Sequence, residues 1–259
     1  MHPFINHPTT GNILEYKDSH GYTLQIIPVI DLMNGSVVHA RHGDRAHYRP
    51  LRSTLSDSNQ PRQVVDALLR LHAFQTLYIA DLDAILRRGD NWQSIRAISR
   101  HYPFLALWID AGLRGHCDIA QWRLTGSRTH IVVGSESLPD TRLLNHPLLR
   151  NTVRYAVLSL DFQGETFLGP AELATDTFAW PEHVIIMTLE RVGSRQGPNL
   201  DRLRQLTTLS PTTAWYMGGG VRSVDDLHTL NAQGISGVLI ASALHNGAIS
   251  SADLAAFTS

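Results

Sequence analysis

The sequence predicts an α/β protein, a single (β/α)8 or TIM barrel of eight parallel strands alternating with helices. Its 259 residues are close to the length that is typical of one such barrel. Eight short apolar runs alternate along the chain with amphipathic stretches. Part of the sequence also recurs once, which predicts a two-fold internal repeat of half-barrels.

The eight apolar runs are continuous rather than alternating, as is typical of strands buried on both faces. They cover Ile26 to Ile30, Thr76 to Ala80, Phe104 to Ile109, His130 to Val133, Tyr155 to Leu160, Val184 to Thr188, Thr213 to Met217 and Gly237 to Ile240. Helical patterns lie between them, as in Pro61 to Phe74, Asn91 to Arg100 and Val224 to Ala232. An open doubly wound sheet is the alternative, but the glycine signature expected after its first strand is missing.

The internal repeat joins the third and seventh runs and the fourth and eighth. Trp108, Gly112, Gly134 and Ser135 recur as Trp215, Gly219, Ala241 and Ser242, at an offset of 107 (215 − 108). In the same register Asp83 falls on Glu190. An accidental repeat is the alternative, but several positions coincide. The repeat predicts two quasi-equivalent anion sites on opposite sides of the barrel mouth.

Composition sets limits on partners and location. Residues 1–25 show no sustained period and are predicted to be an N-terminal extension ahead of a barrel over residues 26–259. A formal net charge of -1 favours neither nucleic acid nor a membrane surface as partner, and no apolar run is long enough for a span. The single cysteine, Cys117, fits a reducing compartment. We therefore expect a cytoplasmic monomer or small homo-oligomer.

Two kinds of chemistry are disfavoured by residue content. The only lysine is Lys17, which precedes the first predicted strand. A Schiff-base aldolase needs a desolvated lysine on a barrel strand, so that reaction is excluded. His39, His42 and His47 lie in the first loop, where histidines are usually solvated rather than bound to zinc. We expect neither a metal ion nor an organic cofactor.

A phosphate site is predicted at the ends of the last two strands. Gly218, Gly219 and Gly220 end strand seven, and Ala241 and Ser242 follow strand eight. Glycines let backbone N–H groups approach an anion closely, and a helix starting near Ser242 would direct its positive end to the same point. A tight turn would account for one glycine but poorly for three.

The matching site in the first half has a weaker signal. Gly112 stands in a stretch with a single glycine, although Gly134 and Ser135 form a good counterpart of the strand-eight end. Asp110 beside a phosphate would repel it unless Arg114 offset the charge. The second anion site is therefore a conditional prediction.

Two aspartates are predicted to form an acid/base pair. Asp31 ends strand one and Asp161 ends strand five. These strands are diametrically opposite in an eight-stranded barrel, so the carboxylates would flank a bound substrate. A lone aspartate at a strand end is more often a helix cap or a partner for arginine. Two in opposed positions favour general acid/base catalysis.

Two further aspartates follow strand two. Asp81 and Asp83 are two residues apart, so one is expected to point into the mouth. We take Asp83 as a candidate substrate-binding residue, and the other carboxylate as a partner for Arg87 or Arg88.

With these residues in place, the sequence resembles the superfamily of phosphoribosylformimino-AICAR ribotide (ProFAR) isomerase and imidazole glycerol phosphate synthase cyclase, of histidine biosynthesis. The resemblance covers nearly the whole predicted barrel. The stretches that carry it are Ile27 to Leu32 with Asn34-Gly35 and Val37-Val38, Asp81-Leu82-Asp83, Gly134-Ser135, Ser159-Leu160-Asp161, Gly193-Ser194 with Gly197-Pro198-Asn199, and Gly218 to Ser223.

The resemblance implies an Amadori rearrangement, in which an aminoaldose phosphate opens to a Schiff base and isomerises to an aminoketose. It assigns Asp31 as the base that removes the C2 proton and Asp161 as the acid that opens the ring. The phosphate-binding residues it implies are Gly219, Gly220, Ala241 and Ser242 for one phosphate and Gly112, Gly134 and Ser135 for the other. Ser194 and Gly218 join these as candidate substrate-binding residues.

The sequence also departs from that pattern. The cyclase branch has a first-loop lysine where this chain has His39. The isomerase pattern Thr-Asp-Ile-x-x-Asp-Gly-Thr is matched by Met187 to Ser194, so its threonine and its loop aspartate are replaced by Met187 and Val192. The first loop and the Arg191 to Ser194 stretch are more similar to a divergent isomerase-related group of methanogens and methylotrophs, which implies a role in methanopterin or methanofuran synthesis.

The leading hypothesis is therefore a sugar-phosphate isomerase that uses Asp31 and Asp161 and whose partner is a small phosphorylated sugar. The alternatives are an enzyme of one-carbon cofactor synthesis and a non-catalytic barrel that binds a phosphosugar.

Overall fold

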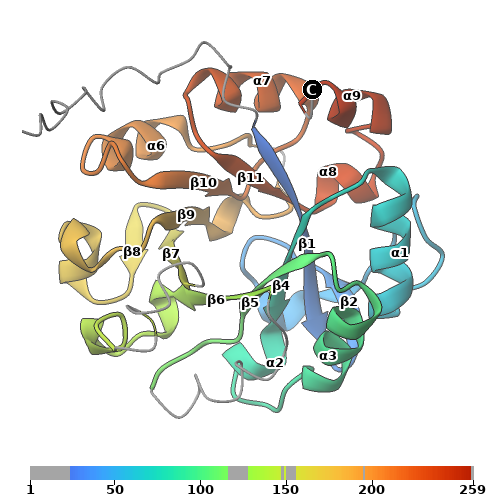
Figure 1. The fold of residues 1–259 in the computed structure, drawn as a ribbon, viewed down its shortest axis with the longest axis horizontal. Coiled ribbons are helices and arrows are strands. Elements are labelled where there is room, and N and C mark those ends of the chain that lie inside the picture. The colour runs from blue at the N-terminus through green and yellow to red at the C-terminus, as the bar shows by residue number, and fades with distance from the viewer. Residues whose placement is uncertain (1–23, 116–127, 147–148, 150–155, 195, 258–259) are drawn as a thin grey trace, which may run out of the picture.

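The structure, a computed structural model, describes residues 24–115, 128–146, 149, 156–194 and 196–257. Eight parallel strands close into a barrel, because the last strand of the sheet pairs with the first. Figure 1 shows these strands around the centre with helices outside them. The predicted (β/α)8 barrel is confirmed. Lys17, Cys117 and residues 1–23 of the predicted extension lie outside the described residues, and the domain boundaries stay a prediction.

The barrel strands lie in the order of the chain. They are β1 (Gln25–Met33), β4 (Thr76–Asp81), β5 (Ala106–Asp110), β6 (Thr129–Gly134), β7 (Ala156–Gln163), β9 (His183–Thr188), β10 (Ala214–Gly218) and β11 (Gly237–Ile240). Three short strands, β2 (Ser36–His39), β3 (Arg49–Pro50) and β8 (Thr166–Leu168), extend the sheet at the rim. Each predicted run coincides with a barrel strand to within a few residues.

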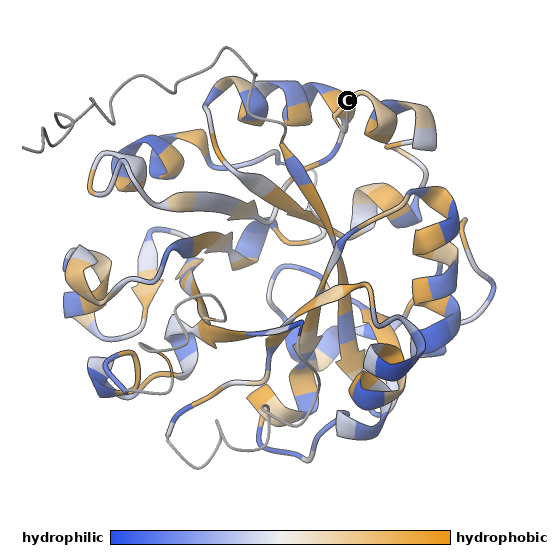
Figure 2. Cartoon of the chain, viewed as in Figure 1, coloured by the Kyte–Doolittle hydropathy of each residue, from blue (hydrophilic) through white to orange (hydrophobic). Residues whose placement is uncertain are grey.

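The helices cover the outside of the barrel. They are α1 (Pro61–Leu71), α2 (Leu82–Ile85), α3 (Trp92–His101), α6 (Leu200–Thr207), α7 (Val224–Ala232), α8 (Ser242–His245) and α9 (Ser251–Ala255). Figure 2 shows hydrophilic residues on their outward sides. In α1, Val64, Val65 and Leu68 recur at helical spacing and are buried against the sheet. Among the described residues, no helix has the length and apolar character that crossing a bilayer requires.

Two separate clusters of buried side chains fill the molecule. The larger lies between the sheet and the helices, and the smaller fills the barrel interior. In the interior, Trp108 and Tyr216 meet edge to face with ring centroids 4.8 Å apart. Since these bulky side chains occupy the interior, the open space is left at the carboxyl ends of the strands.

The half-barrel repeat is visible at the two aspartate strands. The end of β1 folds back into β2, which pairs Asp31 with Val38, and the end of β7 folds back into β8, which pairs Asp161 with Leu168. Both hairpins have a two-residue turn, with positive φ at Asn34 and Gly35 in the first and at Gly164 in the second. β1 and β7 thus each end at the barrel mouth in a hairpin with a two-residue turn.

The structure corrects the register of the predicted repeat in one strand. Trp108 belongs to the interior cluster, but Trp215 faces the helices, because successive strand residues point to opposite faces. The interior residue of β10 is Tyr216, so β10 matches β5 at an offset of 108 (216 − 108). The offset of 107 holds for the neighbouring strands, where η2 (Ser135–Ser137) and α8 begin at matching positions.

Candidate functional site

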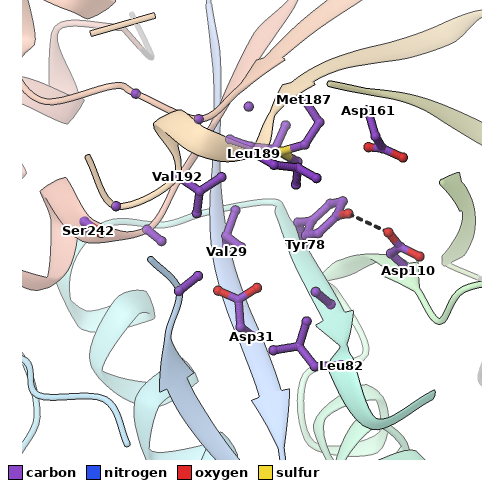
Figure 3. A pocket seen from close by; sticks show the side chains of 18 of the residues that line it. Val29, Asp31, Tyr78, Leu82, Asp110, Asp161, Met187, Leu189, Val192 and Ser242 are labelled. Carbon is purple, nitrogen blue, oxygen red and sulfur yellow. Dashed lines mark hydrogen bonds between the residues drawn. The ribbon is translucent and has the colours of Figure 1, made fainter. Parts of the chain in front are cut away.

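A cavity opens at the carboxyl ends of the strands. This is the face on which (β/α)8 barrels carry their active sites. Its lining includes Asp31, Asp161, Ser194, Gly218, Gly219, Gly220, Ala241 and Ser242 from the sequence prediction. The other lining residues include Val29, Arg45, Tyr48, Tyr78, Leu82, Asp110, Glu136, Met187, Leu189, Val192 and Gly193. Figure 3 shows lining side chains around one space and labels several of them, including Asp31, Asp110 and Asp161.

Asp31 and Asp161 reach this cavity from the opposite strands β1 and β7, as predicted from their positions in the sequence. Asp31 is half-buried, and no hydrogen bond from a described residue reaches its carboxylate. Loss of hydration raises its pKa to about 7, since the attraction of Arg45 only partly offsets that cost and the charge of Asp110 adds to it. Asp31 therefore gains and loses a proton near neutral pH.

Asp161 is held much more firmly. Its Oδ1 accepts a hydrogen bond from Ser159 Oγ at 2.6 Å, and its Oδ2 accepts from the Glu136 N–H at 3.1 Å. Ser135 Oγ also lies 3.3 Å from Oδ2 and accepts the backbone N–H of Asp161 at 2.8 Å. These donors lower its pKa, but burial and the charges of Glu136 and Asp110 outweigh them and raise it to about 8.

A third aspartate, Asp110, lies at the end of β5 on the same wall. Tyr78 Oη donates to its Oδ2 at 3.2 Å, and the Gly112 N–H donates to its Oδ1 at 3.0 Å. Burial raises its pKa to about 6. Figure 3 shows the Tyr78 contact, with Asp161 above Asp110. The sequence prediction treated Asp110 only as an obstacle to a phosphate, and the structure makes it a wall of the cavity.

One guanidinium faces these carboxylates. Arg45, from the short helix η1 (Arg45–His47), forms an ion pair with Glu136 that is largely shielded from solvent. Sequence reasoning missed both residues, because they come from loops after different strands and belong to no local motif. We define the carboxylate end of the cavity as Asp110, Glu136 and Asp161.

The other side of the cavity is built from backbone. We define the glycine end as Gly193, Ser194, Gly218, Gly219, Gly220, Ala241 and Ser242. Gly219 has φ of +90°, and a Cβ there would lie 2.5 Å from the Thr188 carbonyl oxygen; at Gly220, a Cβ would lie 2.3 Å from the Gly197 carbonyl oxygen. Only glycine fits both positions, and it brings the bare backbone to the cavity.

Ser242 begins α8 and presents its hydroxyl near the first loop. Ser242 Oγ lies 3.3 Å from His39 Nε2. Burial lowers the pKa of His39, and the charge of Arg41 lowers it further. His39 is therefore neutral at pH 7 in this state, and a bound anion would favour its protonated form.

Four predicted binding residues do not line the cavity: Asp83, Gly112, Gly134 and Ser135. The hydroxyl of Ser135 donates to the Leu168 carbonyl at 2.6 Å, so it serves the β7–β8 hairpin. A Cβ at Gly134 would lie 3.3 Å from both Asp110 Oδ2 and Asp161 Oδ2, so this glycine makes room for the two carboxylates. Where a first-half phosphate was predicted, the structure has carboxylates.

Asp81 and Asp83 have different partners from those expected. Both accept hydrogen bonds from the Asn91 side chain, at 2.8 Å each. Asp81 also caps α2 by accepting the Ala84 N–H, and Asp83 accepts the Asn34 N–H at 2.6 Å. They tie the turn after β1 to the start of α3, and neither points into the mouth.

Metal binding has no support in the part of the chain that the structure describes. No group of three or more His, Cys, Asp or Glu residues there could hold a metal ion. His42 Nδ1 lies 2.9 Å from the Glu190 carbonyl oxygen and His47 Nδ1 lies 2.7 Å from Asp44, so both contact the protein in an exposed loop.

Two replaced positions, one within β9 and one after it, make one wall of the cavity apolar. Met187 and Val192 both line the cavity, whereas the buried Thr188 does not. Thr188 Oγ1 has no hydrogen-bond partner among the described residues. The wall at which the resemblance expects a threonine and an aspartate thus offers no polar group from these two positions.

Comparison with known proteins places the chain in context. Residues 25–250 match the model of a family described as histidine biosynthesis protein. An uncharacterized protein of Methanocaldococcus jannaschii is 30% identical, over 87% of this chain and 95% of its own length. The 1-(5-phosphoribosyl)-5-((5-phosphoribosylamino)methylideneamino) imidazole-4-carboxamide isomerase of Lactiplantibacillus plantarum is also 30% identical, over 90% of this chain and 99% of its length. That of Thermus thermophilus is 30% identical as well, over 87% and 96%.

Proposed function

The chain belongs to the histidine biosynthesis protein family, and from that membership we propose that it is an isomerase that converts a phosphorylated aminoaldose into an aminoketose. The observation that carries the proposal is the pair Asp31 and Asp161. Both line one cavity from opposite strands, and burial raises the pKa of each to near neutral pH. Enzymes that transfer protons at neutral pH need groups with such pKa values.

The proposed roles are those that the resemblance implies. Asp161, whose pKa is raised to about 8 by burial and by the charges of Glu136 and Asp110, serves as the acid. Asp31, whose pKa is raised to about 7 chiefly by burial, serves as the base. The glycine end binds the phosphate through backbone N–H groups.

In the first step, Asp161 gives its proton to the sugar ring oxygen while the bond between C1 and that oxygen breaks. The lone pair of the substrate nitrogen forms the C1=N bond of a Schiff base. Asp31 then removes the proton from C2, and the electron pair forms C1=C2 and neutralises the nitrogen. Asp31 returns its proton to C1, and the C2 hydroxyl gives its proton to Asp161, which leaves the ketone and restores both groups.

Turnover assays of two single variants test this proposal. We expect Asp31→Asn and Asp161→Asn each to lower kcat by about 10² to 10⁴, the usual contribution of a positioned acid or base. Asp57→Asn, at an exposed position outside the cavity lining, is the matched control. If both variants of the pair turned over the substrate like the control, the proposed mechanism would be wrong.

The pathway is a separate question. The isomerase relatives are named for a compound with two phosphoribosyl groups. We propose that this chain acts on a different aminoaldose, because Met187 and Val192 remove two polar groups from the cavity wall. A role in methanopterin or methanofuran synthesis is the candidate that the resemblance implies. Expression in a histidine auxotroph that lacks the isomerase tests this: growth would assign the histidine pathway, and failure with folded protein would favour the other.

A non-catalytic phosphosugar-binding barrel is the second candidate. The same apolar replacements favour it, since they remove side chains that a retained activity would be expected to keep. Titration calorimetry separates the two candidates. Tight binding of aminoaldose phosphates without turnover of any of them would support the binding protein.

A further inference from the structure

The two ends of the cavity occupy equivalent places in the two half-barrels. Asp110 pairs with Ala80 and Val132, and Gly218 pairs with Met187 and Leu239. Met187 and Leu239 each lie 107 positions after Ala80 and Val132 (187 − 80, 239 − 132). Asp110 is therefore the first-half counterpart of Gly218, the residue that opens the glycine end. A carboxylate stands where the other half leaves space for a ligand.

Two N–H groups and one hydroxyl of the first half already have partners. The Gly112 N–H donates to Asp110, the Glu136 N–H donates to Asp161, and the Ser135 hydroxyl donates to the Leu168 carbonyl. In the second half, by contrast, no hydrogen bond from a described residue occupies the N–H of Gly220 or of Ser242. These two N–H groups are therefore available to a ligand.

The two ends of the cavity also differ in charge. Asp31 and the carboxylate end together hold four acidic side chains, and Arg45, the guanidinium among the described lining residues, is paired with Glu136. Even with Asp161 protonated, a doubly charged phosphate placed there would meet the carboxylates of Asp31 and Asp110 in a poorly hydrated space, where repulsion is strong. A protonated amine would meet several acceptors, and hydrogen bonds between charged partners are the strong ones.

We infer that the substrate carries a single phosphate, bound at the glycine end, and a basic nitrogen that faces the carboxylate end in place of a second phosphate. This inference rests on the proposed function and names the class of substrate that the same cavity takes. In Figure 3 the two chemistries lie on opposite sides of the space, with Ser242 on one side and Asp110 and Asp161 on the other.

Calorimetry at pH 7 with two matched pairs of sugars tests the inference on the wild-type protein. Glucose 6-phosphate and glucosamine 6-phosphate differ by an amine, and fructose 6-phosphate and fructose 1,6-bisphosphate differ by a phosphate. We expect the amine to tighten binding about tenfold, and the second phosphate to weaken it about tenfold or more. Equal or tighter binding of the bisphosphate, or no gain from the amine, would overturn the inference.

The same titrations separate this inference from the proposed function. If the monophosphates bind without discrimination, only the inference fails. If none of the four sugars binds, the phosphate site fails, and the proposed function and the inference are both lost.

A double variant tests which residues cause the expected differences in binding among these sugars. Asp110→Asn with Glu136→Gln removes two carboxylates and frees Arg45 from its ion pair. We expect the penalty for the bisphosphate and the gain from the amine each to shrink about tenfold, while Asp57→Asn changes neither. Unchanged discrimination in a double variant that melts like the wild type would mean that these carboxylates do not select the ligand.

Discussion

The ends of β5 and β6 have the same backbone arrangement as the ends of β10 and β11. The two pairs differ in the groups that they present to the cavity. Each pair of strands ends in a glycine-containing turn and a short helical turn, η2 in the first half and α8 in the second. At the ends of β5 and β6, the N–H groups of the turns donate to Asp110 and to Asp161 of the neighbouring strand β7. At the ends of β10 and β11, glycines leave the backbone open to the cavity. The same architecture thus presents carboxylates at one end of the cavity and open backbone at the other.

The largest expected difference between the halves concerns their two aspartates. Asp31→Asn should abolish exchange of the C2 proton with solvent deuterium, a loss of about 10³-fold, because the variant has no base. Asp161→Asn should slow ring opening by a similar factor but retain exchange when an open-chain substrate is offered. NMR of the C2 proton measures both. Equal loss of exchange in the two variants would remove the division of roles.

We expect a negative charge introduced at the glycine end to weaken the binding of a phosphorylated sugar. Ser242→Asp places a carboxylate beside the proposed phosphate, and we expect the Kd for glucose 6-phosphate to rise roughly 100-fold from like-charge repulsion. Ser242→Ala is the control at the same position and should cost only a few-fold. Calorimetry measures both, and equal effects of the two substitutions would argue that no phosphate lies there.

The pH profile of kcat/KM gives a smaller, graded effect. Activity requires Asp31 without its proton, with a pKa of about 7, and Asp161 with its proton, with a pKa of about 8. We expect a bell with its maximum between these values and a loss of about tenfold per pH unit beyond each limb. A profile that stayed flat from pH 5 to 7 would exclude an ionised Asp31 as the base.

The smallest effect concerns stability. The pKa of Asp110 is raised from 3.8 to about 6, so the folded state holds its proton more tightly than the unfolded state. The stability that this proton contributes is complete below pH 4 and is lost as the pH rises through 6. Asp110→Asn should therefore stabilise the fold by about 2 to 3 kcal/mol at pH 8 and little at pH 4.

Denaturant unfolding at the two pH values checks this prediction. A variant that was equally or less stable than the wild type at pH 8 would contradict the cost assigned to the Asp110 carboxylate. The expected gain fits a residue that is kept for the site at the expense of stability.

The sequence predicted the barrel and the two aspartates because both signals are local. A continuous apolar run that ends in Asp31 or Asp161 identifies a buried strand and the residue at its carboxyl end. The role of Asp110 depended on a register that differs by one residue between β5 and β10, which reverses the face that each residue presents. The ion pair of Arg45 with Glu136 could not be predicted, because it joins loops 91 residues apart.

Two of the candidate binding residues lie outside the cavity lining for a shared reason. Asp83 and Ser135 are polar residues near the mouth, but their side chains bind a loop or a hairpin instead of lining the cavity. Asp83 accepts hydrogen bonds from Asn34 and Asn91, and Ser135 donates one to the Leu168 carbonyl. A pattern of strand ends gives the position of a polar residue, and only the packing of the loops decides whether its side chain reaches the cavity.

The hairpins after β1 and β7 have a consequence for how this scaffold can change. Each proposed proton carrier is anchored by ladder pairing to a returning strand, so its backbone cannot shift without breaking sheet hydrogen bonds. Apart from Asp161, the residues that distinguish the two ends come from other strands and from short turns. Mutation at β5, β6 and β9 can therefore change which ligand the cavity accepts while the proposed acid and base keep their positions.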